Sequence, residues 1–524
     1  MHLEDAHRPR INGRVLAAVA AAVAAALLTA GAVAAPLTIR TTAEQEQGMS
    51  PGASLADPGA VSTDKMDITL DAAKTRLTVS GKEVWGQTYG GTTLAAPTLH
   101  LEPGTTSSIT LHNRLRVATS LHFHGLHTSP EGSSDNPFLC IPAGASYTYH
   151  LDLPADHPQG TFWYHSHAMG TSCPAETGTG GHAHHMPSAS FVPGDVENQI
   201  SAGLSGELVV GDNRASLPAS LRDVPVHDMV LRDAQIDKAG KIVQNTAATS
   251  IDSNADTVRL VNGQLRPVLS MRPGETQLWR LANIGADIFY RLQLGGYRFR
   301  VLAEDGNEYP AAADAAELLL PPGKRYDVLV TAAQTAGTTW LHTLAYSNGP
   351  QGDSYPDTQL MKLDVSGSAA VTTTDPLPAG TLLHGAEADL RGAVSAQSRT
   401  VVLSEDPSGN SFDINGRQFA MDRPTFDTAA KLGTVEEWTI LNTSGEDHPF
   451  HMHTNAFQVM STNGTPLSAP HRQDTVIVPH ATDGTPGKVV IRQAFTDYPG
   501  RWMFHCHIAA HEDNGMMGYI QVVP

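Results

Sequence analysis

Two motifs recur three times along this chain, at intervals of about 165 residues. The first motif is a glycine, an asparagine nine residues later, and then a pair of side chains separated by one residue. The pair is His-x-His in the first and last copies and Leu-x-Leu in the middle copy. The matched positions are Gly104, Asn113, His122 and His124; Gly274, Asn283, Leu292 and Leu294; and Gly433, Asn442, His451 and His453. Such self-similarity predicts one structural unit that occurs three times.

The second motif is a glycine followed five residues later by a histidine, with an aromatic stretch between them. It ends as His165-Ser-His167 in the first copy and as His505-Cys506-His507 in the last copy. The middle copy keeps His342 alone, which we interpret as an ordinary buried or capping histidine. The first and third copies therefore keep side chains of the metal-binding type, and the middle copy does not.

The local sequence favours β-strands throughout. Segments such as 108–112 and 206–210 are short, rich in β-branched residues, and bounded by glycine, proline, aspartate or asparagine. No long segment has helical periodicity, and 47 glycines and 34 prolines punctuate the chain. The prediction is an all-β fold of three consecutive sandwich domains. We expect these domains over residues 67–212, 213–372 and 395–524, with 373–394 as a linker.

The amino-terminal region has the features of an export signal. Residues 15–35 carry no charge, follow three arginines, and contain Ala32-Val33-Ala34, a small-residue cleavage pattern. Residues 1–35 are therefore predicted to be a signal peptide, and an uncleaved membrane anchor is the alternative. Residues 36–66 are polar and small, which is typical of a flexible tether. The expected location is secreted or in the cell envelope.

The charge balance and the cysteines limit the function further. The formal net charge of −19 argues against a nucleic-acid partner. An oxidising compartment permits a disulfide, and the chain has three cysteines. Cys506 lies inside a histidine cluster, which leaves Cys140 and Cys173 as a possible pair whose separation the sequence does not reveal.

Ten of the 25 histidines fall into four tight clusters. Residues i and i+2 of a strand point to the same face, so each His-x-His aims two imidazoles at one point. A single such pair would be read as two surface histidines. Four pairs at matched positions of duplicated domains instead predict metal sites, and imidazole clusters suit copper, zinc or iron.

The last cluster, which begins at His505-Cys506-His507, distinguishes copper from the other candidate metals. Cys506 must point away from its neighbours His505 and His507, so it serves a different metal from theirs. Two histidines, one cysteine and a weak methionine ligand form a blue-copper site, whereas a structural zinc site would prefer more thiolates. The candidate ligands are His448, Cys506, His511 and Met516, with Met517 as the neighbouring candidate for the methionine.

The other eight histidines are too many for one metal and fit a cluster of several coppers between the first and third domains. Residues 505–507 would link that cluster to the thiolate by a short covalent path.

At these residues the chain resembles the multicopper oxidase family, in particular its three-domain, laccase-like bacterial members. The resemblance covers nearly all of the chain after about residue 67 and rests on four motifs. They are His122-Phe-His124-Gly, His165-Ser-His167, His448-Pro-Phe-His451-Met-His453, and the stretch from His505-Cys506-His507 through His511 to Met516. The resemblance implies three cupredoxin-like Greek-key β-sandwiches. It also implies an oxidase that couples one-electron oxidation of a reductant to four-electron reduction of O₂ to water.

The family's copper ligands carry over residue by residue, and imply four copper ions. Type 1 copper would be held by His448, Cys506, His511 and Met516, and type 2 copper by His122 and His451. The type 3 pair would be held by His124, His165, His167, His453, His505 and His507. The expected reductants are phenols and aromatic amines first, and Fe(II), Mn(II) or Cu(I) second.

Reduction of O₂ consumes protons, so acids are expected beside the cluster. Glu512 resembles the acid found there in some bacterial relatives, and Asp135 resembles another, although its spacing from His122 is about two residues longer than in the family. For each acid, a solvated surface carboxylate is the alternative.

The sequence also bears on two functions other than an oxidase. Copper-dependent nitrite reduction would need no type 3 pair, and a copper-sequestering or scaffold protein could lose ligands, whereas this chain has the full set. The histidine-rich stretch 182–186 is either an extra copper-binding or substrate-side loop or a surface insertion. No long methionine-rich segment of the copper-detoxifying type is present, which argues against a dedicated cuprous oxidase.

Overall fold

The computed structural model describes residues 52–61, 67–79, 82–91, 93–173, 193–254, 257–370, 377–385, 387–406, 411–467 and 471–524. The predicted signal peptide, residues 36–51 of the tether and the stretch 182–186 lie outside these ranges. The described residues are almost entirely strand and loop, which confirms the all-β prediction. No helix among them has the length and apolar character that crossing a bilayer requires.

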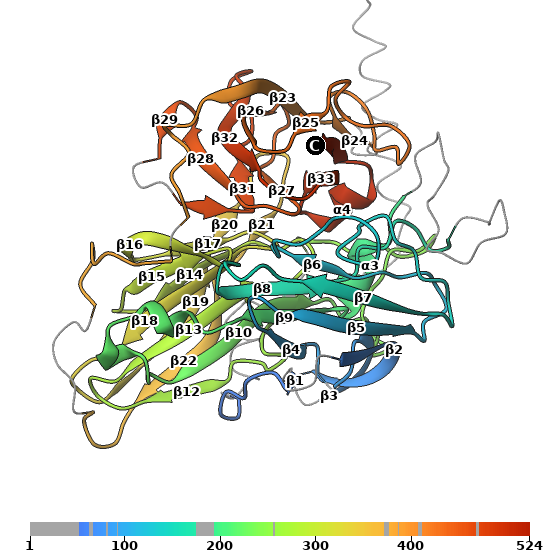
Figure 1. Ribbon diagram of the computed structural model, residues 1–524. Helices are drawn as coiled ribbons and strands as arrows, with labels where there is room; N and C mark the ends of the chain where they lie inside the picture. The colour runs from blue at the N-terminus through green and yellow to red at the C-terminus, as the bar shows by residue number, and fades with distance from the viewer. Residues whose placement is uncertain are drawn as a thin grey trace, which may run out of the picture. The chain divides into compact units, whose positions relative to one another are not determined.

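The first domain consists of two sheets around one apolar core (Figure 1). Its strands are β1 (Ala60–Val61), β2 (Asp67–Val79), β3 (Lys82–Thr88), β4 (Ala96–Leu101), β5 (Thr106–Asn113), β6 (His122–His124), β7 (Ser146–Asp152), β8 (Gly160–His165) and β9 (Ser205–Val210). The sheet orders are β3-β2-β5-β7 and β1-β4-β9-β8-β6. One short helix, α3 (Val196–Ala202), precedes β9.

The middle domain repeats this arrangement with longer sheets. Its strands are β10 (Val226–Ala234), β11 (Val258–Val261), β12 (Val268–Met271), β13 (Thr276–Asn283), β14 (Tyr290–Leu294), β15 (Phe299–Glu304), β16 (Asn307–Ala315), β17 (Leu318–Leu320), β18 (Arg325–Thr331), β19 (Gly337–Leu344), β20 (Tyr346–Ser347), β21 (Ser354–Tyr355) and β22 (Thr358–Val365). The two 3-10 helices η1 (Asn213–Ser216) and η2 (Ala219–Leu221) lead into it. The main sheets are β11-β10-β13-β18-β15-β16 and β12-β22-β19-β14-β17.

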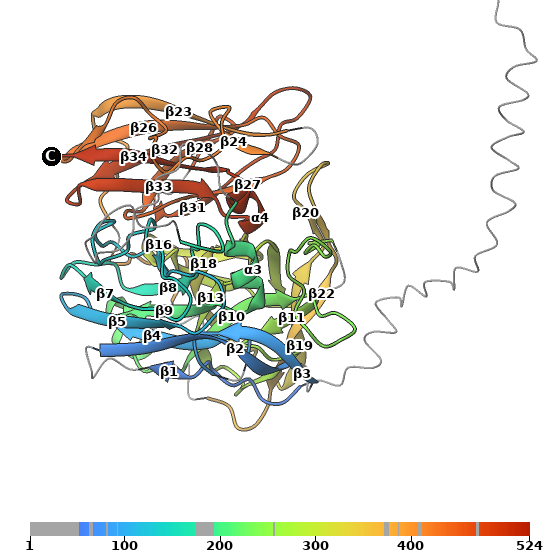
Figure 2. The ribbon, with the colours of Figure 1, turned by 90° about the vertical axis from the view of Figure 1, so that its right-hand side faces the viewer.

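The third domain has the same two-sheet plan (Figure 2). Its elements are β23 (Ser395–Glu405), β24 (Phe412–Ile414), β25 (Ala430–Lys431), β26 (Thr434–Asn442), β27 (His448–Met452), β28 (Phe457–Thr462), β29 (Thr465–Pro466), β30 (Arg472–Gln473), β31 (Thr475–Val478), β32 (Gly487–Phe495), β33 (Gly500–Cys506), α4 (Ala509–Asp513) and β34 (Met517–Val523). The sheets are β24-β23-β26-β32-β28-β29, with β30 beside β28, and β25-β34-β33-β27-β31.

The three domains share one scheme of strand pairing. The parallel pairs β2–β5, β10–β13 and β23–β26 correspond, as do the antiparallel pairs β6–β8, β14–β19 and β27–β33. The repeat seen in the sequence is therefore a repeat of the fold. The exact limits 67–212, 213–372, 373–394 and 395–524 stay predictions.

The repeated asparagine explains why the first motif is so regular. In each domain it ends a strand, and its Nδ2 donates to two backbone carbonyls, one in the loop that follows and one further along the chain. The acceptors are Val117 and Ile141 for Asn113, Ile288 and Leu320 for Asn283, and Glu446 and Val478 for Asn442, all at 2.7–3.1 Å. In the first and third domains the fixed loop leads into the strand that carries the His-x-His pair. The motif thus sets the position of that strand.

The structure bears on the sequence-based predictions for residues 52–61 and for His342. The tether prediction is wrong for residues 52–61: the backbone of Leu55 donates to Val268 at 2.8 Å, and β1 pairs with β4. Those backbone bonds hold the segment although most of its side chains are small. His342 lies in β19 with its side chain 30% exposed and paired with Asp357 at 2.9 Å, so it is an ordinary partly exposed histidine.

Cys140 and Cys173 form a disulfide with their Cα atoms 5.7 Å apart. The possible pairing is thereby confirmed. The bond closes a loop that contains β7 and β8, and so contains His165 and His167 of the four candidate ligand histidines of the first domain.

We predict that the double variant Cys140→Ser/Cys173→Ser is destabilised by about 3–4 kcal/mol, because the bond no longer restricts the unfolded chain. Chemical unfolding of the parent and the variant measures this difference. An unchanged midpoint would show that the disulfide contributes nothing to stability.

Candidate metal centres

The histidines of the first and third domains meet in one buried group. The ring of His122 stacks on that of His453 with centroids 3.8 Å apart, and His124 stacks on His451 at 3.7 Å. The Nε2 atom of His507 lies 3.1 Å from Nδ1 of His124. The imidazole cluster comprises His122, His124, His165, His167, His451, His453, His505 and His507, each at most 1% exposed.

Strand register explains how each domain delivers its rings. His122 lies directly opposite His165 in the β6–β8 pair, and His451 lies opposite His505 in the β27–β33 pair. Residues directly opposite in an antiparallel pair share a face. Cys506 lies one residue further along β33, and its side chain reaches His448 and His511 instead of the cluster.

The ring nitrogens of the cluster group into three triads. Within each triad, the candidate ligand atoms all lie within 4.8 Å of one another. The triads are His122, His124 and His451; His124, His165 and His507; and His167, His453 and His505. Three such groups could hold up to three metal ions side by side.

The hydrogen bonding of the rings fits metal ligation. The Nε2 atoms of His122, His165 and His451 are buried, and no described residue offers any of them a hydrogen bond. Their Nδ1 atoms do have partners: the Asp135 carboxylate at 3.0 Å, the Ser166 carbonyl at 2.9 Å and the Asp474 carbonyl at 2.8 Å, respectively. A partner on one ring nitrogen fixes the tautomer and turns the lone pair of the other toward a metal.

Burial also keeps these rings neutral. It lowers the pKa of His165 to about 3 and that of His167 to about 4, and neighbouring histidines lower the pKa of His122 and His453 further. A neutral imidazole has a free lone pair, and a buried lone pair without a partner is costly. The donor set therefore fits metal ions.

The second centre, the thiolate site, consists of His448, Cys506 and His511. The Sγ atom of Cys506 lies 3.5 Å from Nδ1 of His448 and 3.6 Å from Nδ1 of His511. Burial raises the pKa of the thiol, but the charges of the two imidazoles outweigh it and lower the pKa to about 7. One thiolate and two imidazoles are the donor set of a blue-copper site.

The structure favours Met516 over Met517 as a neighbour of the thiolate site. Met516 is fully buried in the same apolar cluster as Cys506, and its carbonyl accepts the Cys506 N–H at 3.1 Å. Met517 instead packs with Phe138 and Met503 in a separate cluster.

Carboxylates hold the outer nitrogens of the thiolate site. The Nε2 atom of His448 lies 2.8 Å from the Ser444 hydroxyl and 3.0 Å from Glu405. The Nε2 atom of His511 lies 2.8 Å from Glu446. His511 is the less buried of the two rings, with 9% of its side chain exposed against none for His448. Of the two rings, His511 therefore lies nearer the solvent.

Both predicted acids lie inside the protein, so the surface alternative is wrong for each. The Asp135 carboxylate contacts His122 at 3.0 Å and accepts the Phe123 N–H at 2.9 Å. Glu512 lies 3.1 Å from Nδ1 of His505 and 3.3 Å from Nε2 of His167. Burial raises the pKa of Asp135 to about 8. Burial alone would raise the pKa of Glu512 too, but the adjacent imidazoles lower it to about 2.

The middle domain supports the imidazole cluster through residues that the sequence analysis missed. Asp474 accepts from His124 Nε2 at 2.9 Å, and Arg325 of the middle domain donates to Asp474 at 2.9 and 2.7 Å. A Cβ atom on Gly323 would lie 3.1 Å from both His124 and His507, so the backbone passes directly against the rings. No motif or spacing marks these positions, because their partners belong to other domains.

We predict that Arg325→Leu lowers the free energy of unfolding by about 3–5 kcal/mol, because it leaves the Asp474 carboxylate buried and unpaired. The exposed pair of Arg272 with Glu275 provides the control: Arg272→Leu should cost about 0–1 kcal/mol. Denaturant titration of both variants measures the difference. Equal losses would show that the buried ion pair does not support the junction.

Comparison with known proteins agrees with these centres. Three family models, each described as multicopper oxidase, match residues 71–185, 227–368 and 392–524. A multicopper oxidase of Staphylococcus haemolyticus is 26% identical over 445 residues, covering 83% of each chain. A laccase of Bacillus subtilis is 24% identical over 457 residues, covering 78% of this chain and 80% of that protein.

A solved multicopper oxidase of Campylobacter jejuni, described as a metallo-oxidase, superposes with a TM-score of 0.72 at 24% identity, covering 91% of this chain and 96% of that one.

Three cupredoxin-like sandwiches with a thiolate site beside an imidazole cluster define an oxidoreductase that uses copper. The three family models match in order along the chain and together cover about three quarters of it. The chain belongs to the multicopper oxidase family.

Proposed function

We propose that this chain is a laccase-like oxidase that binds four copper ions. Type 1 copper would be held by the thiolate site with Met516, and type 2 copper by His122 and His451. The triad His124, His165 and His507 and the triad His167, His453 and His505 would hold one type 3 copper each. The observation that carries the proposal is the set of buried ring nitrogens without hydrogen-bond partners at the point where the two domains meet.

When bound, copper would supply one-electron oxidation of a reductant at the type 1 site and four-electron reduction of O₂ to water at the other three ions. The chain's contribution is to position and connect these sites. Cys506 is joined through the backbone to His505 and His507, which belong to different triads. The thiolate is therefore one residue away from ligands of both type 3 ions.

The acids have separate tasks in this proposal. Glu512 contacts two rings of one type 3 triad, His167 and His505, and is enclosed by protein, so its carboxylate can accept and pass on protons beside the site of O₂ reduction. Asp135 touches His122 and the backbone of Phe123, so it positions the type 2 ligand.

We expect copper analysis of the loaded protein to give about four ions per chain. In Cys506→Ser we expect about three ions, no blue absorption and no turnover, because the thiolate is the electron entry. The disulfide variant Cys140→Ser/Cys173→Ser is the matched control and should stay blue. Normal substrate oxidation by Cys506→Ser would make the assignment of the entry site wrong.

The surroundings of His511 favour certain reductants among those expected. Glu446 contacts the Nε2 atom of His511, and Asp353 of the middle domain lies close to Glu446. Burial and the nearby charge of Glu446 raise the pKa of Asp353. Negative charge at the point of electron entry attracts cations and repels anions. We infer that neutral phenols, cationic aromatic amines and reduced metal ions are preferred to anionic aromatic compounds.

For Glu446→Gln, we predict that kcat/KM falls roughly three- to tenfold for a cationic aromatic amine and stays level or rises for an aromatic sulfonate. Initial rates at low ionic strength measure both. Glu437→Gln, on β26 and paired with Arg492, is the matched control and should change neither rate. An equal loss with both reductants would mean that Glu446 acts by positioning His511 and not by charge.

We also propose that the mature protein works outside the cytoplasm. Two features support this: the signal-like residues 1–35, and the Cys140–Cys173 disulfide, which is typical of an oxidising compartment.

A further inference from the structure

A pocket of about 490 Å³ lies between the first and middle domains, away from both metal centres. Strands β2 and β3, the loop after β5 and the end of α3 contribute from the first domain, and the segment after β10 contributes from the middle domain. Pockets of this volume commonly hold small molecules. None of the proposed copper ligands or acids lines it.

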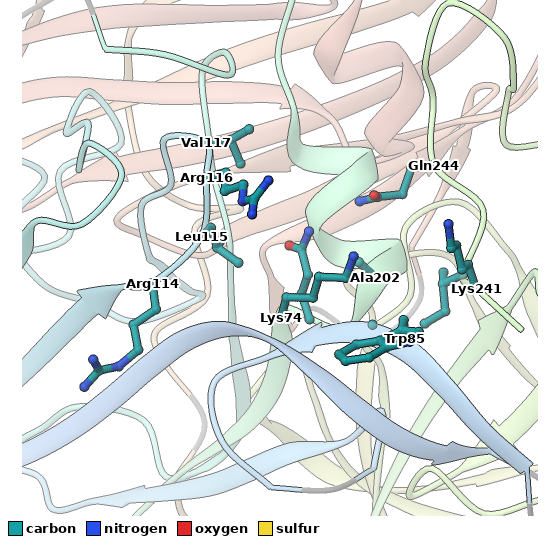
Figure 3. A pocket seen from close by; sticks show the side chains of 12 residues that line it. Lys74, Trp85, Arg114, Leu115, Arg116, Val117, Ala202, Lys241 and Gln244 are labelled. Atoms are coloured by element: carbon teal, nitrogen blue, oxygen red, sulfur yellow. The ribbon is translucent and has the colours of Figure 1, made fainter.

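The charge of this pocket is opposite to that of the chain. Lys74, Arg114, Arg116 and Lys241 line it, although the formal net charge of the protein is −19. Arg114 is paired with Asp71 at 2.7 Å, and Figure 3 shows it directed away from the other three. Lys74, Arg116 and Lys241 have no ion-pair partner among the described residues. Three cationic groups therefore face one cavity without a neutralising carboxylate.

The remaining wall of the pocket is apolar and aromatic. Trp85 is 39% exposed, one of the few large apolar side chains at the surface of the described residues, and the buried side chains of Leu115 and Ile242 lie beside it. The Nζ atom of Lys74 lies over the Trp85 ring, 5.5 Å from its centroid, so the nearest cation and the aromatic wall adjoin. The aromatic wall and the three cations without ion-pair partners would together suit a ligand with a planar ring system and several acidic groups.

We propose that this pocket binds an aromatic polyanion. Its ring system lies against Trp85, Leu115 and Ile242, and its acidic groups pair with Lys74, Arg116 and Lys241. Because the cations come from two domains, the bound ligand also ties the first domain to the middle domain. Binding there leaves the metal centres accessible.

The test uses the copper-loaded protein and pyrene tetrasulfonate, an aromatic polyanion whose fluorescence anisotropy reports binding. We expect saturable binding of one molecule per chain and a rise in the unfolding temperature, since a ligand that binds only the folded state stabilises it. Arg116→Glu and Lys241→Glu should each weaken binding roughly tenfold, and Trp85→Ala roughly fivefold.

Two controls separate the proposed site from general attraction to positive charge. Lys488→Glu reverses an exposed charge on β32 of the third domain and should change affinity by less than about twofold. Oxidase activity without the probe should stay at the parent level in all four variants, which also shows that they fold. Binding that is unchanged by Arg116→Glu and Lys241→Glu overturns the proposal. So does equally tight binding of inositol hexakisphosphate, a polyanion without an aromatic ring, that is insensitive to Trp85→Ala.

Discussion

Eight imidazoles buried at one domain junction are the constraint on which the rest of this structure depends. A buried polar nitrogen without a partner destabilises a protein, and here the Nε2 atoms of His122, His165 and His451 have no hydrogen-bond partner among the residues that the structure describes. A metal ion relieves the cost by taking the lone pairs, so function and stability are linked at this point. The stacking of His122 on His453 and of His124 on His451 means that neither outer domain has a complete site alone.

The middle domain has no histidine pair, but it is not a passive spacer. Its Arg325 neutralises Asp474, which in turn contacts His124, and its Asp305 accepts the backbone N–H groups of Asp474 and Thr475 at 3.1 Å. These contacts fix β31 of the third domain against the first. The middle copy, which has Leu292 and Leu294 at the matched positions, is thus a domain whose charged residues hold the other two in place.

Strand geometry connects the two metal centres. Because successive residues at the end of β33 point to opposite faces, His505 and the next residue after the strand, His507, reach the imidazole cluster while Cys506 reaches His448 and His511. The same alternation places the two centres at a fixed separation of one residue along the backbone. Helical structure at this position would put the three side chains around an axis and would not separate the two sites so cleanly.

Local patterns in the chain predict the β class, the threefold repeat and the set of side chains that can bind metal. These follow from local rules: a period of two in a strand, and spacing such as that from Gly104 to Asn113 and on to His122. Three other features depend on contacts between distant segments. These contacts determine which rings share a triad and place Met516, not Met517, with Cys506. They also pair residues 52–61 with neighbouring strands. Tertiary structure also brought Arg325, Asp474 and the cations of the pocket to their partners. Those contacts join residues of different domains, and no local pattern in a chain records which distant segment will lie beside it.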